Sequence, residues 1–363
     1  MKRLKKEKAF FTAALLALSS FLMTSCDDSF FENEGDCEVT HVVKFVYDMN
    51  LKWADAFPSE VNSVNLYVFD NNGLFVKGYQ ESGDQLSNPD FAIELDLPVG
   101  SYKFLAWCGL DNPRATEESF TVTQPVAGQT SLQDVICSLN TQSVSVYASG
   151  DNSTVYSNKR LYFLYYGYME QTLVDNHDGS NYEYIISLTK DTNHIRIILQ
   201  ELNGDDLNPN DYAITIESAN GTLGWNNQLL GNTMITYEPW NQENDEVGVG
   251  KIDVIDGSLK YVKGLVADLS SCRLMATSMN DMMLVITNTE NGEDIARVPL
   301  IQYALLSKRY YELAYGHQMT DQEFLDREDE YVMTFFLANG RWMDTYIDIQ
   351  QWRIVLHDYG LGQ

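Results

Sequence analysis

The clearest strand signal in the chain reads Val64-Asn65-Leu66-Tyr67-Val68-Phe69-Asp70-Asn71-Asn72-Gly73. Its first six residues alternate with a period of two, which is the spacing of a half-buried strand. The run ends in Asp and Asn residues followed by Gly73, and these residue types tolerate the positive φ angles of a tight hairpin turn. The stretch therefore predicts a strand that enters a β-hairpin.

The same period of two recurs on both sides of this stretch. The predicted strands follow one another at short intervals, and no long helical pattern separates them. This arrangement favours an all-β protein built from antiparallel β-sandwiches over a parallel sheet. The other predicted strands lie at 43–47, 93–97, 102–107, 195–199, 212–216, 283–285, 347–349 and 352–356.

The length of 363 residues suits about two domains, because single cores rarely grow beyond roughly 250 residues. The polar stretch 174–181 has the strongest turn signals in mid-chain. We therefore expect an N-terminal β-sandwich domain at 37–178 and a C-terminal one at 179–363. One minor helical segment is expected at 321–331, where good helix formers combine with acids near the N-terminus. Its charged residues are expected to form a solvated face.

The first 25 residues have the pattern of a secretory signal peptide. Five basic residues crowd the first eight positions, and an apolar run from Ala9 to about Met23 follows them. The run of about 15 residues is short for a transmembrane helix, which needs about 20, so a membrane-spanning anchor is the weaker alternative.

The end of this run resembles a bacterial lipobox. In Leu22-Met23-Thr24-Ser25-Cys26, small residues precede a cysteine. Such a cysteine becomes the lipidated amino terminus after cleavage, and its acyl chains hold the protein on a membrane without a spanning helix. Cys26 is therefore the predicted lipid attachment site, and a plain secreted protein with an ordinary thiol at this position is the alternative. The acidic residues after Cys26 resemble the export tag of surface lipoproteins in the Gram-negative group that builds type V pili.

The composition excludes some classes of partner. The hydrophobic fraction of 44% and the aromatic fraction of 12% are typical of a globular protein. The formal net charge is −28, and removal of residues 1–25 takes away five basic residues and one acidic residue, which changes it to −32. A surface this acidic argues against a nucleic-acid partner and does not attract anionic lipid head groups. Contact with a membrane must therefore come from the lipid.

Four further cysteines remain: Cys37, Cys108, Cys137 and Cys272. Outside the cell they could form disulfides, and four cysteines allow three pairings. The sequence does not choose among these pairings. A zinc site is not indicated, because no two cysteines are spaced as C-x-x-C and no histidine lies beside any of them.

No sequence motif indicates catalysis, a cofactor or a metal. The five histidines are scattered, and the sequence contains no G-x-S-x-G elbow, phosphate-binding loop or dinucleotide-binding glycine pattern. The spacing of Asp206, Asn208, Asn210 and Glu217 imitates an EF-hand loop, but the required glycine is replaced by Asp211. The residues that follow alternate as a strand, so a turn leading into a strand is the preferred interpretation.

The six tryptophans could in principle form a sugar-binding platform. Trp107 and Trp352 lie inside strand patterns and are expected in the core. Trp225 and Trp240 lie in Asn- and Gly-rich surroundings and are the two candidates for contact with a glycan.

Several segments together resemble one family, the FimB/Mfa-type fimbrial anchor lipoproteins of type V pili. The similarity extends in order from about Cys37 to Leu356, beside the lipobox. The segments that carry it are Phe45-Val46-Tyr47-Asp48-Met49-Asn50, Ala54-Asp55-Ala56-Phe57, 64–73, Leu97-Pro98-Val99-Gly100-Ser101-Tyr102, Leu105-Ala106-Trp107-Cys108-Gly109-Leu110, 189–196, 322–329 and Ile349-Gln350-Gln351-Trp352-Arg353-Ile354-Val355.

The resemblance implies two transthyretin-like β-sandwich domains in tandem and a non-enzymatic role in adhesion at the base of a fimbria. The protein would tie the fibre to the outer membrane through its lipid and limit the length of the fibre. Its partner would be the shaft subunit, fimbrillin, and assembly would use donor-strand exchange, in which an extended strand fills an open groove. Residues 26–36 would be a lipidated tether, with 27–36 reaching about 30 Å when extended.

Another surface lipoprotein function remains open. The aromatic content and the same lipoprotein signal also fit a glycan-binding protein of a polysaccharide-uptake system. Trp225 and Trp240 are the residues on which that alternative depends.

Overall fold

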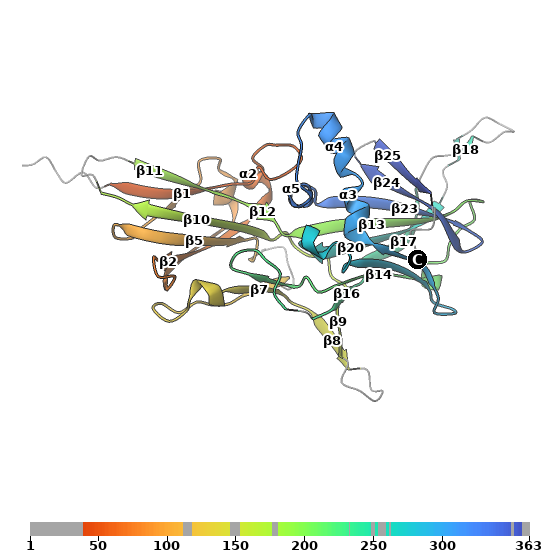
Figure 1. Ribbon diagram of the computed structural model, residues 1–363, viewed down its shortest axis with the longest axis horizontal. Coiled ribbons are helices and arrows are strands. Elements are labelled where there is room, and N and C mark those ends of the chain that lie inside the picture. The colour runs from red at the N-terminus through yellow and green to blue at the C-terminus, as the bar shows by residue number, and fades with distance from the viewer. Residues whose placement is uncertain are drawn as a thin grey trace, which may run out of the picture.

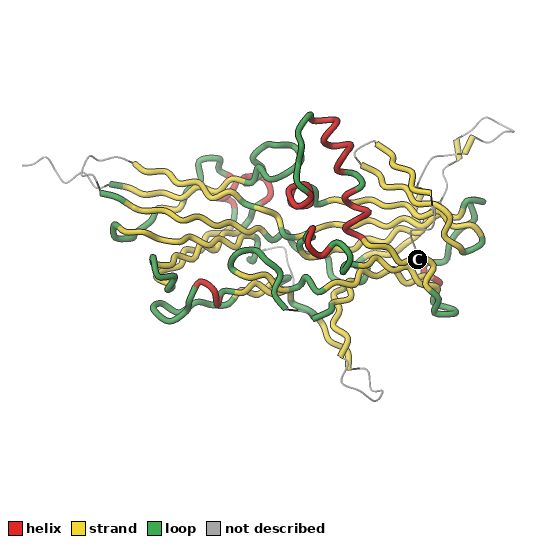
Figure 2. The backbone as a smooth tube through the Cα atoms, viewed as in Figure 1, coloured by secondary structure: helices red, strands yellow, loops and turns green. Residues whose placement is uncertain are grey.

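The computed structural model describes residues 39–111, 118–145, 153–175, 181–231, 233–247, 251–252, 259–260, 263–349 and 352–357. The molecule is elongated, with sheets running along its length (Figure 1), and strands far outweigh helices (Figure 2). The predicted all-β class with tandem β-sandwiches is confirmed. The signal peptide, Cys26, the tether 26–36 and Cys37 lie outside the described residues.

The first group of sheets is a three-layered stack. A five-stranded sheet forms the middle layer, and each of its faces packs against a three-stranded sheet. The middle sheet has the order β12 (Thr189–Lys190), β10 (Tyr165–Leu173), β5 (Gly100–Cys108), β2 (Ser63–Asp70), β3 (Phe75–Ser82). The outer sheets are β11 (Asn181–Ser187), β1 (Thr40–Val46), β4 (Ile93–Glu94), and β15 (Thr222–Gly224), β7 (Ile136–Leu139), β6 (Phe120–Val122).

The second group is a sandwich of two six-stranded sheets whose apolar faces share one core. One sheet has the order β17 (Asn241–Glu246), β20 (Lys263–Cys272), β13 (Thr192–Glu201), β23 (Glu330–Ala338), β24 (Arg341–Ile349), β25 (Trp352–His357). The other is β22 (Asp294–Pro299), β21 (Met283–Asn288), β14 (Tyr212–Ser218), β16 (Ile235–Tyr237), β9 (Ser153–Ser157), β8 (Gln142–Ser145). A separate two-stranded ribbon joins β18 (Lys251–Ile252) and β19 (Leu259–Lys260).

The hairpin predicted from 64–73 is confirmed, but the expectation that its strand is half-buried is wrong. Gly73 has a φ of 81°, and the carboxylate of Asp70 accepts a hydrogen bond from the Leu74 N–H at 2.9 Å. Residues 63–69 are all buried, because β2 lies in the middle layer of the stack. Tyr67 and Phe69 belong to a different core from Val64 and its neighbours on the opposite face. The aromatic residues on the second face of β2 therefore pack against the outer sheet of β15, β7 and β6.

Strand pairing crosses the boundary expected near residue 178 in both directions. β11 follows that position but pairs in parallel with β1, and β9 precedes it but pairs in parallel with β16 of the second group. The segment from β12 to β13 then runs from one group into the other. Most other pairs are antiparallel, as predicted, with β13 and β23 a third parallel pair. The division of the chain into 37–178 and 179–363 stays a prediction.

The predicted helical segment is present but shorter than expected. It is α5 (Asp321–Arg327), which begins where the Thr320 side chain accepts a hydrogen bond from the Glu323 N–H at 3.1 Å. The last predicted residues instead start β23. The sequence did not predict α2 (Phe57–Glu60), α3 (Leu300–Leu305) or α4 (Lys308–Tyr315).

The cysteines inside the described part of the chain are free thiols. Cys108, Cys137 and Cys272 are all buried in apolar surroundings. Burial raises the pKa of the Cys272 thiol to about 12 and also raises the pKa of the other two. A thiol in such surroundings is a poor nucleophile, so these side chains act as small core residues.

Candidate functional site

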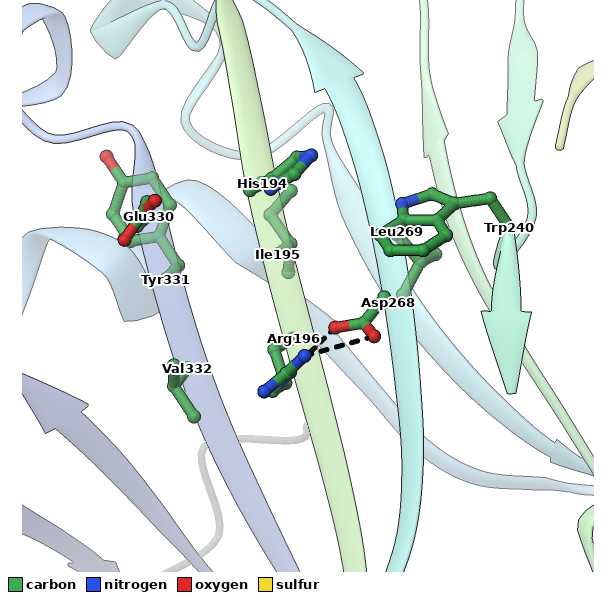
Figure 3. Close-up of a pocket in the computed structure, with 9 residues that line it drawn as sticks. All are labelled: His194, Ile195, Arg196, Trp240, Asp268, Leu269, Glu330, Tyr331 and Val332. Atoms are coloured by element: carbon green, nitrogen blue, oxygen red, sulfur yellow. Dashed lines mark hydrogen bonds and ion pairs between the residues drawn. The ribbon is translucent and has the colours of Figure 1, made fainter. Parts of the chain in front are cut away.

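A groove lies on the outer face of the sheet that contains β13, β20 and β23. It has a volume of about 270 Å³. Antiparallel pairing places Arg196 opposite Asp268 and His194 opposite Ser270, so these four side chains share the outer face. Their neighbours Ile195 and Leu269 point to the core. The residues that line the groove are His194, Ile195, Arg196, Trp240, Asp268, Leu269, Glu330, Tyr331 and Val332 (Figure 3).

The groove combines an ion pair with aromatic rings. Arg196 donates two hydrogen bonds to the Asp268 carboxylate, at 2.7 and 3.2 Å. The ring centroids of His194 and Trp240 are 6.0 Å apart, and the Arg160 guanidinium lies 5.3 Å from the centroid of the Trp240 ring. Burial and then the charge of Arg160 lower the pKa of His194, so the imidazole is neutral at pH 7.

The two tryptophans that the sequence singled out are not equivalent. Trp240 lines the groove, whereas Trp225 is not among the described residues that line it. The Trp225 ring instead packs on the core and meets Tyr168 edge to face, with 5.4 Å between ring centroids. Trp107 is fully buried, as predicted, and the side chain of Trp352 lies outside the described atoms.

A buried cation joins the two groups of sheets. The side chain of Lys190, at the end of β12, is 4% exposed. Its Nζ lies 2.6 Å from an oxygen of Glu60, in α2, and 2.6 Å from an oxygen of Asp329, directly before β23. The ammonium also lies 4.1 Å from the centre of the Phe163 ring. Lys190 therefore links the first group to the second.

A second buried cation lies beside α5. Arg273 donates to both oxygens of Asp326 at 2.8 Å, and its Nε lies 3.5 Å from Asp191. On the same helix Arg327 is buried and donates to the backbone oxygen of Asp48 at 3.0 Å. The expectation that this charged segment is a solvated face is therefore wrong for Asp326 and Arg327, because Asp326 pairs with the buried Arg273 and Arg327 is itself buried. Asp321, by contrast, is exposed.

Two buried acids at this junction have strongly raised pKa values. Burial raises the pKa of Asp191 to about 7, although Arg273 and Asn227 oppose the shift. One oxygen of Asp191 has no hydrogen-bond partner among the described residues. Burial likewise raises the pKa of Glu328 to about 7, although hydrogen bonds from Glu330 and Tyr311 lower it.

Three strands at the ends of their sheets differ in how they are protected. Charged side chains on an edge strand hinder pairing with another chain. The β3 edge carries Lys77, paired with the Asp96 carboxylate at 2.9 Å, and the β17 edge is acidic. On β11, Ile185 is 54% exposed, and Glu183 is neutralised by Lys44 at 2.8 Å. Among these three, β11 is the edge least protected by charge.

The EF-hand-like segment forms a turn and a strand, as preferred from the sequence. A short 3₁₀ turn at Pro209–Asp211 leads directly into β14, and Glu217 binds Arg297 at 2.8 Å. Within the described ranges, no group of three or more His, Cys, Asp or Glu side chains is arranged to hold a metal ion. The same part of the chain has no helix long and apolar enough to cross a membrane.

The chain is similar to fimbrial and adhesin proteins. One curated relative is the minor fimbrium anchoring subunit Mfa2 of Porphyromonas gingivalis, 24% identical over 306 residues, which span 82% of this chain and 80% of the relative. The solved structure of the fimbrial anchor protein Mfa2 from the same organism has a TM-score of 0.61 at 18% identity, covering 88% of this chain and 99% of that one. This second likeness supports the fold.

Two structures from Bacteroides thetaiotaomicron are more similar in sequence. A candidate adhesin is 30% identical with a TM-score of 0.71, and the match covers 86% of this chain and 96% of the adhesin chain. A candidate polysaccharide-binding protein is 28% identical with a TM-score of 0.70, covering 88% and 99%.

A family model described as "Fimbrillin-A associated anchor proteins Mfa1 and Mfa2" matches residues 33–358, which is most of the chain. This match agrees with the resemblance seen in the sequence and with the tandem β-sandwich fold. The chain belongs to the family of fimbrillin-A associated anchor proteins Mfa1 and Mfa2.

Proposed function

We propose that this protein anchors a type V fimbria to the outer membrane through a lipid on Cys26 and limits the length of the fibre. The observation that carries the proposal is the lipobox 22–26, which lies shortly before the region 33–358 matched by a family of fimbrial anchor proteins. A diacylated cysteine gives stable membrane attachment, since two acyl chains bury many methylene groups. The role is structural and adhesive, and it requires no catalytic residue.

The tether 26–36 would give the anchored protein freedom above the membrane. Strand β1 begins at Thr40, in the first group of sheets. The ten residues 27–36 can span about 30 Å when extended. The first β-sandwich can therefore stand clear of the lipid head groups and face the fibre.

The lipid attachment is tested by a Cys26→Ala variant. We expect the variant to leave the membrane fraction, because the acylated thiol is lost. Cys37→Ala is the matched control, since it removes a nearby cysteine outside the lipobox and should stay with the membrane. Retention of Cys26→Ala in the membrane fraction would overturn the anchoring claim.

The fimbrial partner is proposed to be the shaft subunit, fimbrillin, bound by donor-strand exchange. The edge of β11 is the proposed place of contact, because it combines an exposed apolar side chain with a neutralised acid. An added strand would pair with its main chain and cover Ile185.

Charge on this edge tests the proposed contact. Ile185→Lys should reduce the amount of fimbrillin that purifies with the protein at least tenfold. Val76→Lys places the same charge on the β3 edge, at a side chain that is 39% exposed, and should have little effect. Equal loss in both variants, or loss in neither, would remove β11 as the contact.

A second candidate function is glycan binding at the cell surface. It is favoured by the similarity to a protein described as a candidate polysaccharide binder, at 28% identity over most of both chains. A glycan array probed with the purified protein tests it, and a uniformly negative array would exclude it.

A further inference from the structure

We propose that the groove between β13, β20 and Trp240 is a binding site for one neutral sugar residue of a glycan. This inference rests on the second candidate function and gives it a place and a ligand class. It is independent of the anchoring role, which needs no ligand in this groove.

The first observation is a cluster of polar atoms that lack partners. Trp240 Nε1, His194 Nε2 and Ser270 Oγ are each buried without a hydrogen-bond partner in the described part of the chain. Buried polar groups are nearly always paired, so each exception calls for an explanation. Trp240 and His194 line the groove, whereas Ser270 lies on the same sheet face but is not among the described residues of the lining. The two exceptions in the lining indicate a place prepared for a polar ligand.

The geometry places these atoms together. Ser270 lies directly opposite His194 in the β13–β20 pair, so both side chains share one face, and Ser270 is only 2% exposed. The Trp240 N–H of the main chain donates to the Asp268 carbonyl at 3.0 Å, which holds the indole beside the same strand. Figure 3 shows the rings of His194 and Trp240 on the same side of the Arg196–Asp268 pair, and the two rings are tilted by 33° to each other.

The charges around the groove nearly balance, which favours a neutral ligand. Asp268 and Glu330 contribute two carboxylates to the lining, and Arg196 contributes one cation that is already paired with Asp268. The Arg160 guanidinium lies against the Trp240 ring. An anionic ligand would have to compete with Asp268 for Arg196 and would lie beside Glu330. A cationic ligand would have to compete with Arg196 for Asp268.

The hydrogen-bond donors and acceptors of the groove lining favour a ligand that carries several hydroxyl groups. The indole N–H is only a donor, a carboxylate is only an acceptor, and a neutral imidazole offers both functions. Sugar hydroxyl groups likewise both donate and accept. An aromatic ring beside them suits the apolar face of a sugar ring, and about 270 Å³ lies just below the usual range for larger ligands, about 300–1,000 Å³.

The experiment is titration of the purified full-length protein in detergent with free glucose, galactose, mannose and N-acetylglucosamine, followed by saturation-transfer NMR. We expect at least one sugar to bind. Trp240→Phe keeps an aromatic ring but removes the N–H, and should weaken that binding at least tenfold. Trp53→Phe is the matched control, since this exposed indole lies outside the groove and stacks on Arg327, and it should leave the affinity unchanged.

The remaining outcomes distinguish a failure of this groove as the binding site from a failure of the glycan-binding function itself. Glycan binding that Trp240→Phe leaves intact but Trp225→Phe removes would overturn this groove while the glycan function stands. No binding on a glycan array or in the titrations would overturn both. Loss of fimbrillin binding in Trp240→Phe, with no sugar bound by the unaltered protein, would identify the groove as a protein contact and overturn the proposal.

Discussion

Replacing Lys190 with Met should weaken the attachment of the two groups of sheets to each other. The methionine fills a similar volume but removes the ammonium that lies 2.6 Å from oxygens of both Glu60 and Asp329. Those carboxylates come from different groups, and their side chains are 31% and 26% exposed. Without the cation they repel each other across the junction.

The size of the expected destabilisation follows from the burial of the Lys190, Glu60 and Asp329 side chains. Removing one partner of a buried ion pair costs about 3–5 kcal/mol, because the other charge is left without compensation. Here both acids keep some contact with water, which lowers that cost toward about 2–3 kcal/mol. Loss of the cation–π contact with Phe163, at 4.1 Å, adds roughly 1 kcal/mol. We therefore expect a loss of about 3 kcal/mol in the free energy of unfolding.

Urea unfolding monitored by far-UV circular dichroism measures this loss. Lys77→Met is the control, because Lys77 and Asp96 form an exposed pair, which is worth about 0–1 kcal/mol. Adding Glu60→Gln to Lys190→Met should recover part of the loss by removing one of the two repelling charges. A loss below about 1 kcal/mol for Lys190→Met, equal to that of Lys77→Met, would refute the reasoning.

Two further predictions concern pH and backbone geometry. The pKa of Glu328 is raised to about 7 in the folded protein, so the folded state binds more protons than the unfolded state between about pH 4.5 and 7, and this group makes stability fall as pH rises through that window. Across this window the effect amounts to at most about 3 kcal/mol in the free energy of unfolding, and Glu328→Gln should abolish it. The surface change Glu290→Gln should leave the pH dependence of stability unchanged. The same pH dependence in both variants would contradict the assignment. Gly109 has a φ of 85° and an added Cβ would lie 2.0 Å from the Phe163 carbonyl oxygen, so Gly109→Ala should cost about 3 kcal/mol or more in thermal unfolding. Gly128→Ala, with φ 69° and open space around it, should cost only about 1–2 kcal/mol, and a similar cost for both alanines would show that the close contact is not what matters.

Local signals in the sequence predicted local structure well. The turn after Phe69 was predictable because Asp, Asn and Gly favour it whatever the rest of the chain does. The N-terminus of α5 was predictable for a similar reason, since Thr320 and the acids after it are favourable at a helix start. The burial of both faces of β2 was missed, although Tyr67 and Phe69 on the second face are large aromatic residues that could have indicated it.

The pairing of distant strands could not be predicted in the same way. β1 and β11 pair in parallel although Val43 and Tyr184 are far apart in the sequence. A period of two shows which side chains share a face, but it does not identify the neighbouring strand or its direction. The crossing of the expected boundary near residue 178 follows from such long-range pairing.

The groove was only partly predictable for the same reason. Trp240 was a candidate from its polar surroundings, but His194 was one of five scattered histidines, and Arg196, Asp268 and Ser270 had no distinguishing pattern. Only the register of β13 against β20 brings them together. Their unpartnered atoms are a property of the folded chain and have no counterpart in the sequence.

The central claim is that this protein ties the fimbria to the cell through Cys26. The most direct test is to measure, by immunoblot of fimbrillin, how much fimbrial material stays with the cells and how much enters the medium when the only copy of the protein carries Cys26→Ala. We predict that most fimbriae move to the medium, while the Cys37→Ala strain retains them. Fimbriae that remain on Cys26→Ala cells at the level of the unaltered strain would contradict the account.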